Sequence, residues 1–500
     1  MDVFDLRNRL VEDYASYTSS FIKIADPRIK EMVETQLADG AFWPEPLLQI
    51  NPTFKPGGTI DDLVKEGILH PECARIFKLD KSDSDHTGKP LFLHAHQREA
   101  ILKAREGKSY VLTSGTGSGK SLTYIIPIVD HVLKRGSGRG IQAIVVYPMN
   151  ALANSQEEEL GKFLHKGYPE GKPPVRFALY TGQEKGEKRE EIRNNPPDIL
   201  LTNYMMLELM LTRWEDSALI RAAQELRFLV FDELHTYRGR QGADVALLIR
   251  RCRLAFGGHD IICVGTSATM ASEGTTEEQK RVVARVAQKL FGVPFDATQV
   301  IGETLERGTK ELDFRDPQVI DALRAAIETE ASPPEKPEDF RCHPLASWLE
   351  STFGIRTEEG IGRLVRQAPR RLQGQDGAAE ELARITGAEP SRCASVLRQY
   401  LMKGSTLKLN LSSRFPIFAF RLHQFFTRGD TVWATMEPEG ERHIEMSKKV
   451  SKPGEPDKPL FPIVFCRQCG TAYYRVKISA DDEGKVLLPR EDHREPDDDE

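Results

Sequence analysis

The sequence lacks any apolar run long enough to cross a bilayer, and it has no excess of positive charge. Its longest apolar runs fall well short of the roughly 18 residues that a membrane-spanning helix needs, and its first residues lack the basic-then-apolar order of a signal peptide. Lysine and arginine number 69 against 75 aspartates and glutamates, for a net charge of -6. We therefore expect a cytoplasmic protein without membrane contact, in which nucleic acid would bind only to local patches or through backbone contacts.

Cysteine is also scarce, with seven in 500 residues. The odd count and the wide spacing of most of them favour reduced thiols over a disulfide framework. A chain of this length has room for two to four domains, each with its own core.

A glycine-rich loop lies between an apolar strand at 109–113 and a helix that begins near Leu122. The loop fits the pattern G-x-x-x-x-G-K-[ST], with serine in place of the first glycine, through Ser114, Gly115, Thr116, Gly117, Ser118, Gly119, Lys120 and Ser121. In such a loop the backbone N–H groups point at one anion, the lysine reaches the β- and γ-phosphates, and the last hydroxyl ligates Mg²⁺. A merely flexible loop is the alternative, but the flanking strand and helix favour a nucleotide site. We predict ATP and Mg²⁺ as cofactors.

Gln97 lies 23 residues before Lys120, at the start of a predicted helix. A side-chain amide at that distance from the phosphate loop would read the donor and acceptor edge of adenine. The alternative is an ordinary surface glutamine.

Further apolar strands follow at 141–147, 176–180, 198–202, 228–231 and 261–264, and helical segments separate them. This alternation predicts an α/β fold with a doubly wound parallel sheet and helices on both faces. Ligands of such sheets bind beyond the carboxyl ends of the strands, which is where the polar motifs of this chain fall.

Two adjacent carboxylates, Asp232 and Glu233, come directly after the strand at 228–231. At the sheet edge the first would hold Mg²⁺, and the second would orient and deprotonate an attacking water. Acidic pairs are common in surface turns, but the three strand-and-helix units between this pair and Lys120 favour nucleotide hydrolysis.

Six motifs resemble, in order and spacing, those of superfamily 2 helicases of the DExH type, whose motor domains are RecA-like. They are Gln97, residues 114–121, Tyr147–Ala153, Thr181–Gly182, Asp232–His235 and Ser267–Thr269. The stretch after Asp232 resembles a narrower group of DNA-repair helicases. The residues before 88, with 421–426 and 465–470, resemble the large helicase subunits of bacterial anti-phage systems such as Druantia.

The resemblance implies a role for each motif. Lys120 and Ser121 would bind the triphosphate and Mg²⁺, Asp232 the metal, and Glu233 would be the catalytic base. His235, Ser267 and Thr269 would couple the nucleotide to domain movement. The strand of nucleic acid would lie on Pro148, Asn150, Thr181, Gly182, Thr202 and Asn203, through contacts that read no sequence. For Thr202 and Asn203 an ordinary strand-end turn explains the residues nearly as well.

These roles predict an ATP-dependent DNA helicase or translocase, in anti-phage defence or DNA repair, acting on single-stranded or unwinding duplex DNA. One alternative is a nucleotide-gated scaffold that binds nucleic acid or a partner without unwinding, and another is an RNA helicase. No second helicase block follows residue 305. We therefore expect a second RecA-like domain in a missing C-terminal part or in another chain, with defence-system subunits as further partners.

The sequence divides into four predicted segments. A mainly helical leader covers 1–88 and ends in a polar linker at 81–88, the RecA-like domain covers 89–305, a helical insertion covers 306–405, and a β-rich region covers 406–500. In the last region Cys466 and Cys469 form a CxxC knuckle of the kind that supplies half of a structural Zn²⁺ site, with His423 and His443 as the nearest further ligands. Two reduced structural thiols are the alternative.

Overall fold

The computed structural model describes residues 2–490, apart from 21–22, 39, 41, 83–84, 116, 169–171, 258–259, 269–274, 359–361, 409–415, 427–430, 447 and 482–483. Its contacts group the chain into two compact units. One is Phe54–Glu306, and the other joins Met1–Thr53 to Arg307–Glu500. These units are defined by contact, and the four-segment division by function stays a prediction.

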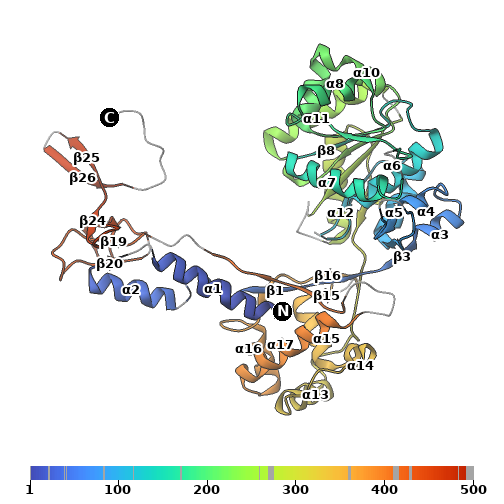
Figure 1. Cartoon of the computed structure of the whole chain (residues 1–500). Coiled ribbons are helices and arrows are strands. Elements are labelled where there is room, and N and C mark those ends of the chain that lie inside the picture. Colours follow the sequence, from blue (N-terminus) through green and yellow to red (C-terminus); the bar gives the residue numbers. More distant parts are fainter. Residues whose placement is uncertain are drawn as a thin grey trace. The chain divides into compact units, whose positions relative to one another are not determined.

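A seven-stranded sheet forms the centre of the unit Phe54–Glu306 (Figure 1). All of its pairings are parallel. In spatial order the strands are β13 (Val300–Gly302), β7 (Tyr110–Thr113), β12 (Ile262–Ser267), β11 (Phe228–Phe231), β8 (Ala143–Tyr147), β10 (Ile199–Asn203) and β9 (Phe177–Leu179). The predicted RecA-like α/β fold is confirmed, although sequence reasoning missed β13.

Successive side chains of the central strands enter two separate hydrophobic cores. On β8, Ala143, Val145 and Tyr147 belong to one core, and Ile144 and Val146 belong to the other. Alternate side chains of a strand point to opposite faces, and both faces of this sheet are covered, so its strands are apolar throughout.

Helices cover each face of the sheet (Figure 1). The first core takes apolar residues from α3 (Ile60–Lys65), α4 (Cys73–Ile76), α5 (Ala95–Arg105), α6 (Leu122–Arg135) and α7 (Asn150–Leu164). The second core takes them from α9 (Tyr204–Thr212), α10 (Ser217–Ala222), α11 (Gly239–Ala255) and α12 (Thr276–Phe291). The helix α8 (Gly186–Asn194), which precedes β10, also contributes Ile192 to the second core.

The polar run at 81–88, predicted as a linker, belongs to the unit Phe54–Glu306. It connects β4 (Lys78–Leu79) to β5 (Lys89–Pro90), which pair antiparallel. Lys81 is buried, and its ammonium donates to the carbonyls of Ile76 and Phe163 at 2.8 and 2.6 Å. The role of this run as a linker stays a prediction. Lysine is polar in a sequence pattern, yet its amine can be satisfied by backbone carbonyls inside a fold.

A helical group with its own core follows residue 306. It contains α13 (Pro317–Glu328), α14 (Pro337–Cys342), α15 (Pro344–Phe353), α16 (Ala378–Thr386) and α17 (Pro390–Thr406). The hairpin β15 (Ile355–Thr357) and β16 (Leu364–Arg366) follows α15. A small sheet orders β17 (Arg370–Arg371), β1 (Leu47–Asn51) and β18 (Ala419–His423), so part of the N-terminal segment packs with this group.

The β-rich C-terminal region packs on an N-terminal helix. Its four-stranded sheet orders β20 (Ile444–Glu445), β19 (Trp433–Ala434), β23 (Phe461–Phe465) and β24 (Ala472–Tyr474). Ile29, on α2 (Pro27–Ala38), shares a core with Val432 and Ile463 of that region. The Asp26 carboxylate, which also accepts two N–H groups at the start of α2, pairs with Arg442 in a buried ion pair. The remaining N-terminal helix is α1 (Val3–Ser20).

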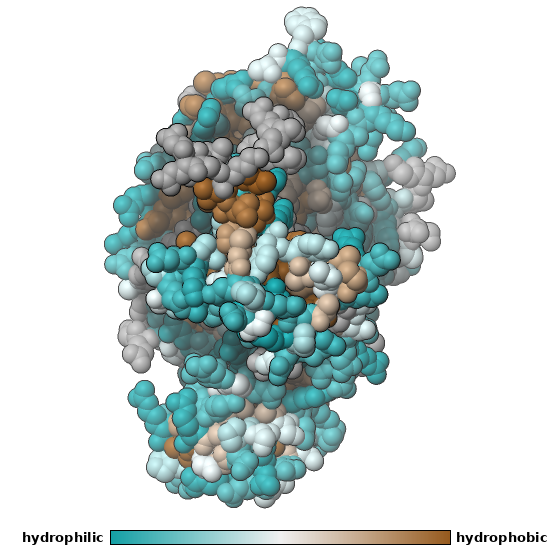
Figure 2. All heavy atoms as spheres, turned by 90° about the vertical axis from the view of Figure 1, so that its left-hand side faces the viewer, coloured by the Kyte–Doolittle hydropathy of each residue, from teal (hydrophilic) through white to brown (hydrophobic). Residues whose placement is uncertain are grey.

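The hairpin of β25 (Val476–Asp481) and β26 (Gly484–Pro489) exposes apolar side chains, including Ile478 and Leu487. Figure 2 shows hydrophobic surface on the face that it views. None of the helices in the described ranges is both long and apolar enough to span a membrane.

Candidate nucleotide site

The phosphate loop begins where β7 ends and closes on itself through two serines. The hydroxyls of Ser114 and Ser118 lie 2.6 Å apart, and both side chains are buried. Serine at the first position therefore ties the two ends of the loop together. Gly117 and Gly119 take φ values of +82° and +68°, a left-handed conformation that favours glycine. Thr116, which the sequence places in this loop, lies outside the described residues.

The Gln97 side chain contacts the phosphate loop through hydrogen bonds. Its amide nitrogen donates to the Gly119 carbonyl at 3.0 Å, and its oxygen accepts the His94 N–H at 2.8 Å. A Cβ on Gly119 would lie 2.5 Å from that nitrogen, so a larger residue there would displace the Gln97 amide. His96, also buried, lies 3.0 Å from the Ser118 carbonyl through Nε2. In this conformation Gln97 uses both ends of its amide within the protein, and its reading of adenine stays a prediction.

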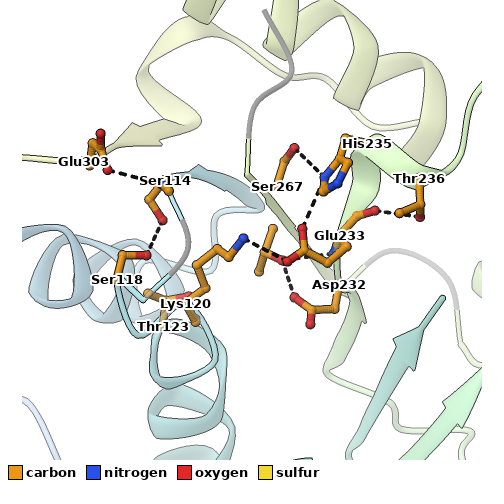
Figure 3. A network of polar contacts seen from close by, with 12 residues as sticks. Ser114, Ser118, Lys120, Thr123, Asp232, Glu233, His235, Thr236, Ser267 and Glu303 are labelled. Atoms are coloured by element: carbon orange, nitrogen blue, oxygen red, sulfur yellow. Dashed lines mark hydrogen bonds and ion pairs between the residues drawn. The ribbon is translucent and has the colours of Figure 1, made fainter. Parts of the chain in front are cut away.

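The structure brings Lys120 and the acidic pair together, as Figure 3 shows. The ammonium of Lys120 lies 2.9 Å from Oε1 of Glu233, and both side chains are largely buried. Glu233 is the second residue after β11 and has a φ of +52°, which is uncommon for a residue with a side chain. That turn places its carboxylate opposite the phosphate loop instead of along the strand.

Thr266 of β12 holds both members of the acidic pair. Its hydroxyl donates to Oδ1 of Asp232 and accepts the backbone N–H of Glu233 at 3.1 Å. Burial raises the pKa of Asp232 above its usual value, and the neighbouring Glu233 raises it further, while Thr266 and Lys120 act in the opposite direction. Sequence reasoning missed Thr266, since it falls between the predicted strand at 261–264 and the motif Ser267–Thr269, and β12 reaches Ser267 in the structure.

His235 connects the acidic pair to the end of β12. Its Nδ1 lies 3.2 Å from Oε2 of Glu233 and 3.3 Å from the Ser267 hydroxyl (Figure 3). This places two of the three predicted coupling residues in contact across adjacent strands. Thr269, the third, lies outside the described residues.

One further carboxylate reaches the loop. Oε2 of Glu303, in the residue after β13, accepts the Gly115 N–H at 3.2 Å (Figure 3). Sequence reasoning missed Glu303 because β13 was not recognised. Only the parallel pairing of β13 with β7 brings the two residues together.

The residues of the site suit a triphosphate with a divalent cation. Backbone N–H groups and an ammonium attract phosphate oxygens, and carboxylates are ligands that Mg²⁺ accepts. Oε2 of Glu233 is buried and makes no hydrogen bond in good alignment, although His235 lies near it. A buried carboxylate oxygen without a donor is available to a cation or to a water molecule.

The predicted strand-binding residues are only partly exposed. Asn203 donates its side-chain amide to Oδ1 of Asn150 at 2.6 Å and caps α9. Thr181 and Thr202 are buried, and the Thr202 hydroxyl donates to the Tyr180 carbonyl at 2.7 Å. Gly182 has open space where a side chain would stand, and Pro148 is half-buried. A nucleic-acid contact at these positions stays a prediction.

The CxxC knuckle packs against the N-terminal segment at Ala25. Gly470 accepts the Ala25 N–H at 3.0 Å, and a Cβ on Gly470 would lie 2.9 Å from that nitrogen. In the ranges that the structure describes, no group of three or more His, Cys, Asp or Glu side chains could hold a metal ion. The predicted Zn²⁺ site at Cys466 and Cys469 is therefore not supported, because neither His423 nor His443 completes it.

Part of this chain is similar to known helicases. A model of the DEAD/DEAH box helicase family matches residues 94–277. The uncharacterized ATP-dependent helicase YprA of Bacillus subtilis is 32% identical over 37% of this chain and 24% of that protein. Druantia protein DruE of Escherichia coli is 26% identical over 50% of this chain and 19% of that protein. The chain thus spans about a quarter or less of the length of these curated relatives.

Solved structures also match. The DUF1998 helicase MrfA bound to DNA is 24% identical, covers 52% of this chain and 31% of its own, and has a TM-score of 0.40. The DEAD-box helicase Mss116 bound to ssRNA and UDP-BeF is 18% identical, covers 56% of this chain and 53% of its own, and has a TM-score of 0.41.

Proposed function

Because this chain contains a DEAD/DEAH box helicase domain, we propose that it binds ATP with Mg²⁺ and uses hydrolysis to move along nucleic acid. The observation that carries this proposal is the contact between Lys120 and Glu233 at 2.9 Å, beside Asp232. The lysine of the phosphate loop and the acidic pair come from two strands of one parallel sheet and meet at its carboxyl edge. A magnesium-bound triphosphate needs both groups within reach at once.

In the proposed site, Lys120 leaves Glu233 when a nucleotide binds and turns to the β- and γ-phosphates. Ser121 and Asp232 would hold Mg²⁺, which supplies positive charge to the phosphate oxygens when bound. Glu233 would accept a proton from the attacking water, because its carboxylate is then free of the lysine. The Thr266 hydrogen bond favours the charged form of Asp232, the form that binds a cation.

Coupling and strand binding extend from this centre. The proposed coupling residues are His235, Ser267 and Thr269. Their conformation would depend on the bound nucleotide and would in turn alter the strand-binding face. That face would use Pro148, Asn150, Thr181, Gly182, Thr202 and Asn203. Because Thr181 and Thr202 are buried, their contribution would come from the backbone, and contacts to phosphates would fall to Gly182 and Asn150.

DNA is the proposed polymer, with RNA as the alternative. MrfA was solved with DNA and Mss116 with RNA, and backbone contacts separate the two polymers poorly unless the 2′-hydroxyl is read. The sequence similarity to Druantia protein DruE supports a role in anti-phage defence, and DNA repair is the alternative role. We propose that a second RecA-like domain, in the same protein or another chain, completes the motor, and that defence-system subunits are further partners.

The test is Glu233→Gln in the full protein, with phosphate release measured with and without single-stranded DNA. We expect the variant to bind ATP and to lose DNA-stimulated hydrolysis, because glutamine keeps the shape and cannot take the proton. Glu190→Gln, an exposed site on α8, is the matched control and should hydrolyse like the parent. Unchanged turnover in Glu233→Gln would refute the assignment of the base.

Two outcomes with the parent protein distinguish the alternatives. ATP binding with turnover at background, whatever polymer is added, would favour the nucleotide-gated scaffold. Stimulation by single-stranded RNA but not by DNA of the same length would favour the RNA helicase.

A further inference from the structure

Glu303 occupies a donor that a phosphate would use. Its carboxylate accepts the Gly115 N–H at 3.2 Å, inside the phosphate loop (Figure 3). Backbone N–H groups of such loops are the groups that bind phosphate oxygens. A carboxylate and a phosphate are both anions, so the two cannot share this donor without repulsion.

Glu303 also begins the segment that leaves the helicase unit. The next residue, Thr304, accepts the Lys55 N–H at 2.9 Å, and the unit ends at Glu306. If the Glu303 side chain moves, the backbone therefore moves only a few residues before the chain enters the other unit at Arg307.

The far end of that segment is fixed by a second carboxylate. Glu350, on α15, is buried, and it accepts the N–H groups of Gly308 and Thr309 at 2.7 and 2.9 Å. Arg341 also donates to the Gly308 carbonyl at 2.6 Å. Glu303 and Gly308 are only five residues apart in sequence, so the chain that joins the two contacts is short.

From these contacts we infer that Glu303 is a phosphate-sensing residue: it satisfies the loop in the absence of nucleotide and is displaced when the triphosphate binds. The displacement then acts on the segment 303–309. The inference rests on the proposed function, because it takes the loop at 114–121 to be the nucleotide site. Glu303 is a positioning residue here and takes no part in the chemistry.

The test compares the affinities of the full chain for Mg·ATP, Mg·ADP and adenosine. Glu303→Gln keeps the size of the side chain and removes its charge. We expect it to bind both phosphorylated nucleotides roughly five- to tenfold more tightly, since one like charge near the phosphates is gone. Its affinity for adenosine, which has no phosphate, should not change. Glu306→Gln, an exposed neighbour on β14 (Leu305–Glu306), should behave like the parent.

The outcomes separate this inference from the proposed function. If Lys120→Ala abolishes nucleotide binding and Glu303→Gln changes nothing or weakens it, the sensing role is wrong and the nucleotide site stands. If Lys120→Ala binds ATP like the parent, the loop is not the nucleotide site and both are wrong.

Hydrogen exchange gives a second measurement, which a purely structural role of Glu303 would leave unchanged. In the parent, Mg·ATP should change the exchange of the peptide that covers 303–309, and adenosine should leave it unchanged. An identical exchange rate with Mg·ATP and without it would overturn the coupling to this segment.

Discussion

Replacing Thr266 with valine should weaken both the fold and the metal site. Valine keeps the shape of threonine but cannot donate to Asp232 or accept from the Glu233 N–H. Loss of a buried hydrogen bond to a charged group costs about 1.5–3 kcal/mol, and the orphaned N–H adds to that. For a unit of the size of Phe54–Glu306, we expect a fall in melting temperature of about 4–12 °C.

The loss should depend on pH in a defined direction. The pKa of Asp232 is higher in the folded chain than in the unfolded one, so folding takes up a proton between the two values. The contribution of Asp232 to the free energy of unfolding therefore falls as the pH rises from its unfolded pKa to its folded pKa. Thr266 favours the charged form, so its removal raises the pKa further, and the cost should be greater at about pH 8 than at about pH 5.

The assay is scanning calorimetry of the full chain with and without Mg·ADP. The transition that shifts on addition of nucleotide should belong to the unit Phe54–Glu306, because the proposed site lies in that unit. Thr212→Val, at an exposed residue whose hydroxyl bonds only to its own helix, is the control. Equal stability and equal nucleotide affinity of Thr266→Val and parent at about pH 8 would refute the reasoning.

Two further predictions concern the other unit. Arg442→Met should lower the free energy of unfolding of that unit by about 3–5 kcal/mol, because it leaves the Asp26 carboxylate buried without the arginine. Chemical denaturation followed by circular dichroism measures this loss. The affinity for nucleotide should stay at the parent value. Cys469 should react with a thiol reagent near neutral pH faster than an ordinary cysteine, because a hydrogen bond from Thr471 lowers its pKa to about 7. Thiols that become reactive only after a chelator is added would contradict this and restore the zinc site.

The RecA-like fold of the unit Phe54–Glu306 could be predicted from the sequence because its signals are local. Each strand of the sheet that we predicted is a short apolar run, and it ends at a polar motif. The stretch 306–405, which was predicted to be helical, contains α13, α14, α15, α16 and nearly all of α17. These signals depend on neighbouring residues alone.

The parts that were missed depend on contacts between distant residues. Glu303 reaches Gly115 only through the pairing of β13 with β7, and β13 is too short to stand out as a strand. Asp26 and Arg442 are separated by 416 residues, and nothing in either local pattern points to the other. The CxxC knuckle resembled half of a metal site because its glycine allows a tight turn, but here that glycine allows a close approach to Ala25.

The central claim is that Lys120 and the acidic pair grip one magnesium-bound triphosphate. The most direct measurement is a crystal structure of this chain with Mg²⁺ and a non-hydrolysable ATP analogue. The account predicts that the Lys120 ammonium leaves Glu233 for the phosphates and that the metal lies beside Asp232. A nucleotide bound elsewhere, with the contact between Lys120 and Glu233 unbroken, would contradict it.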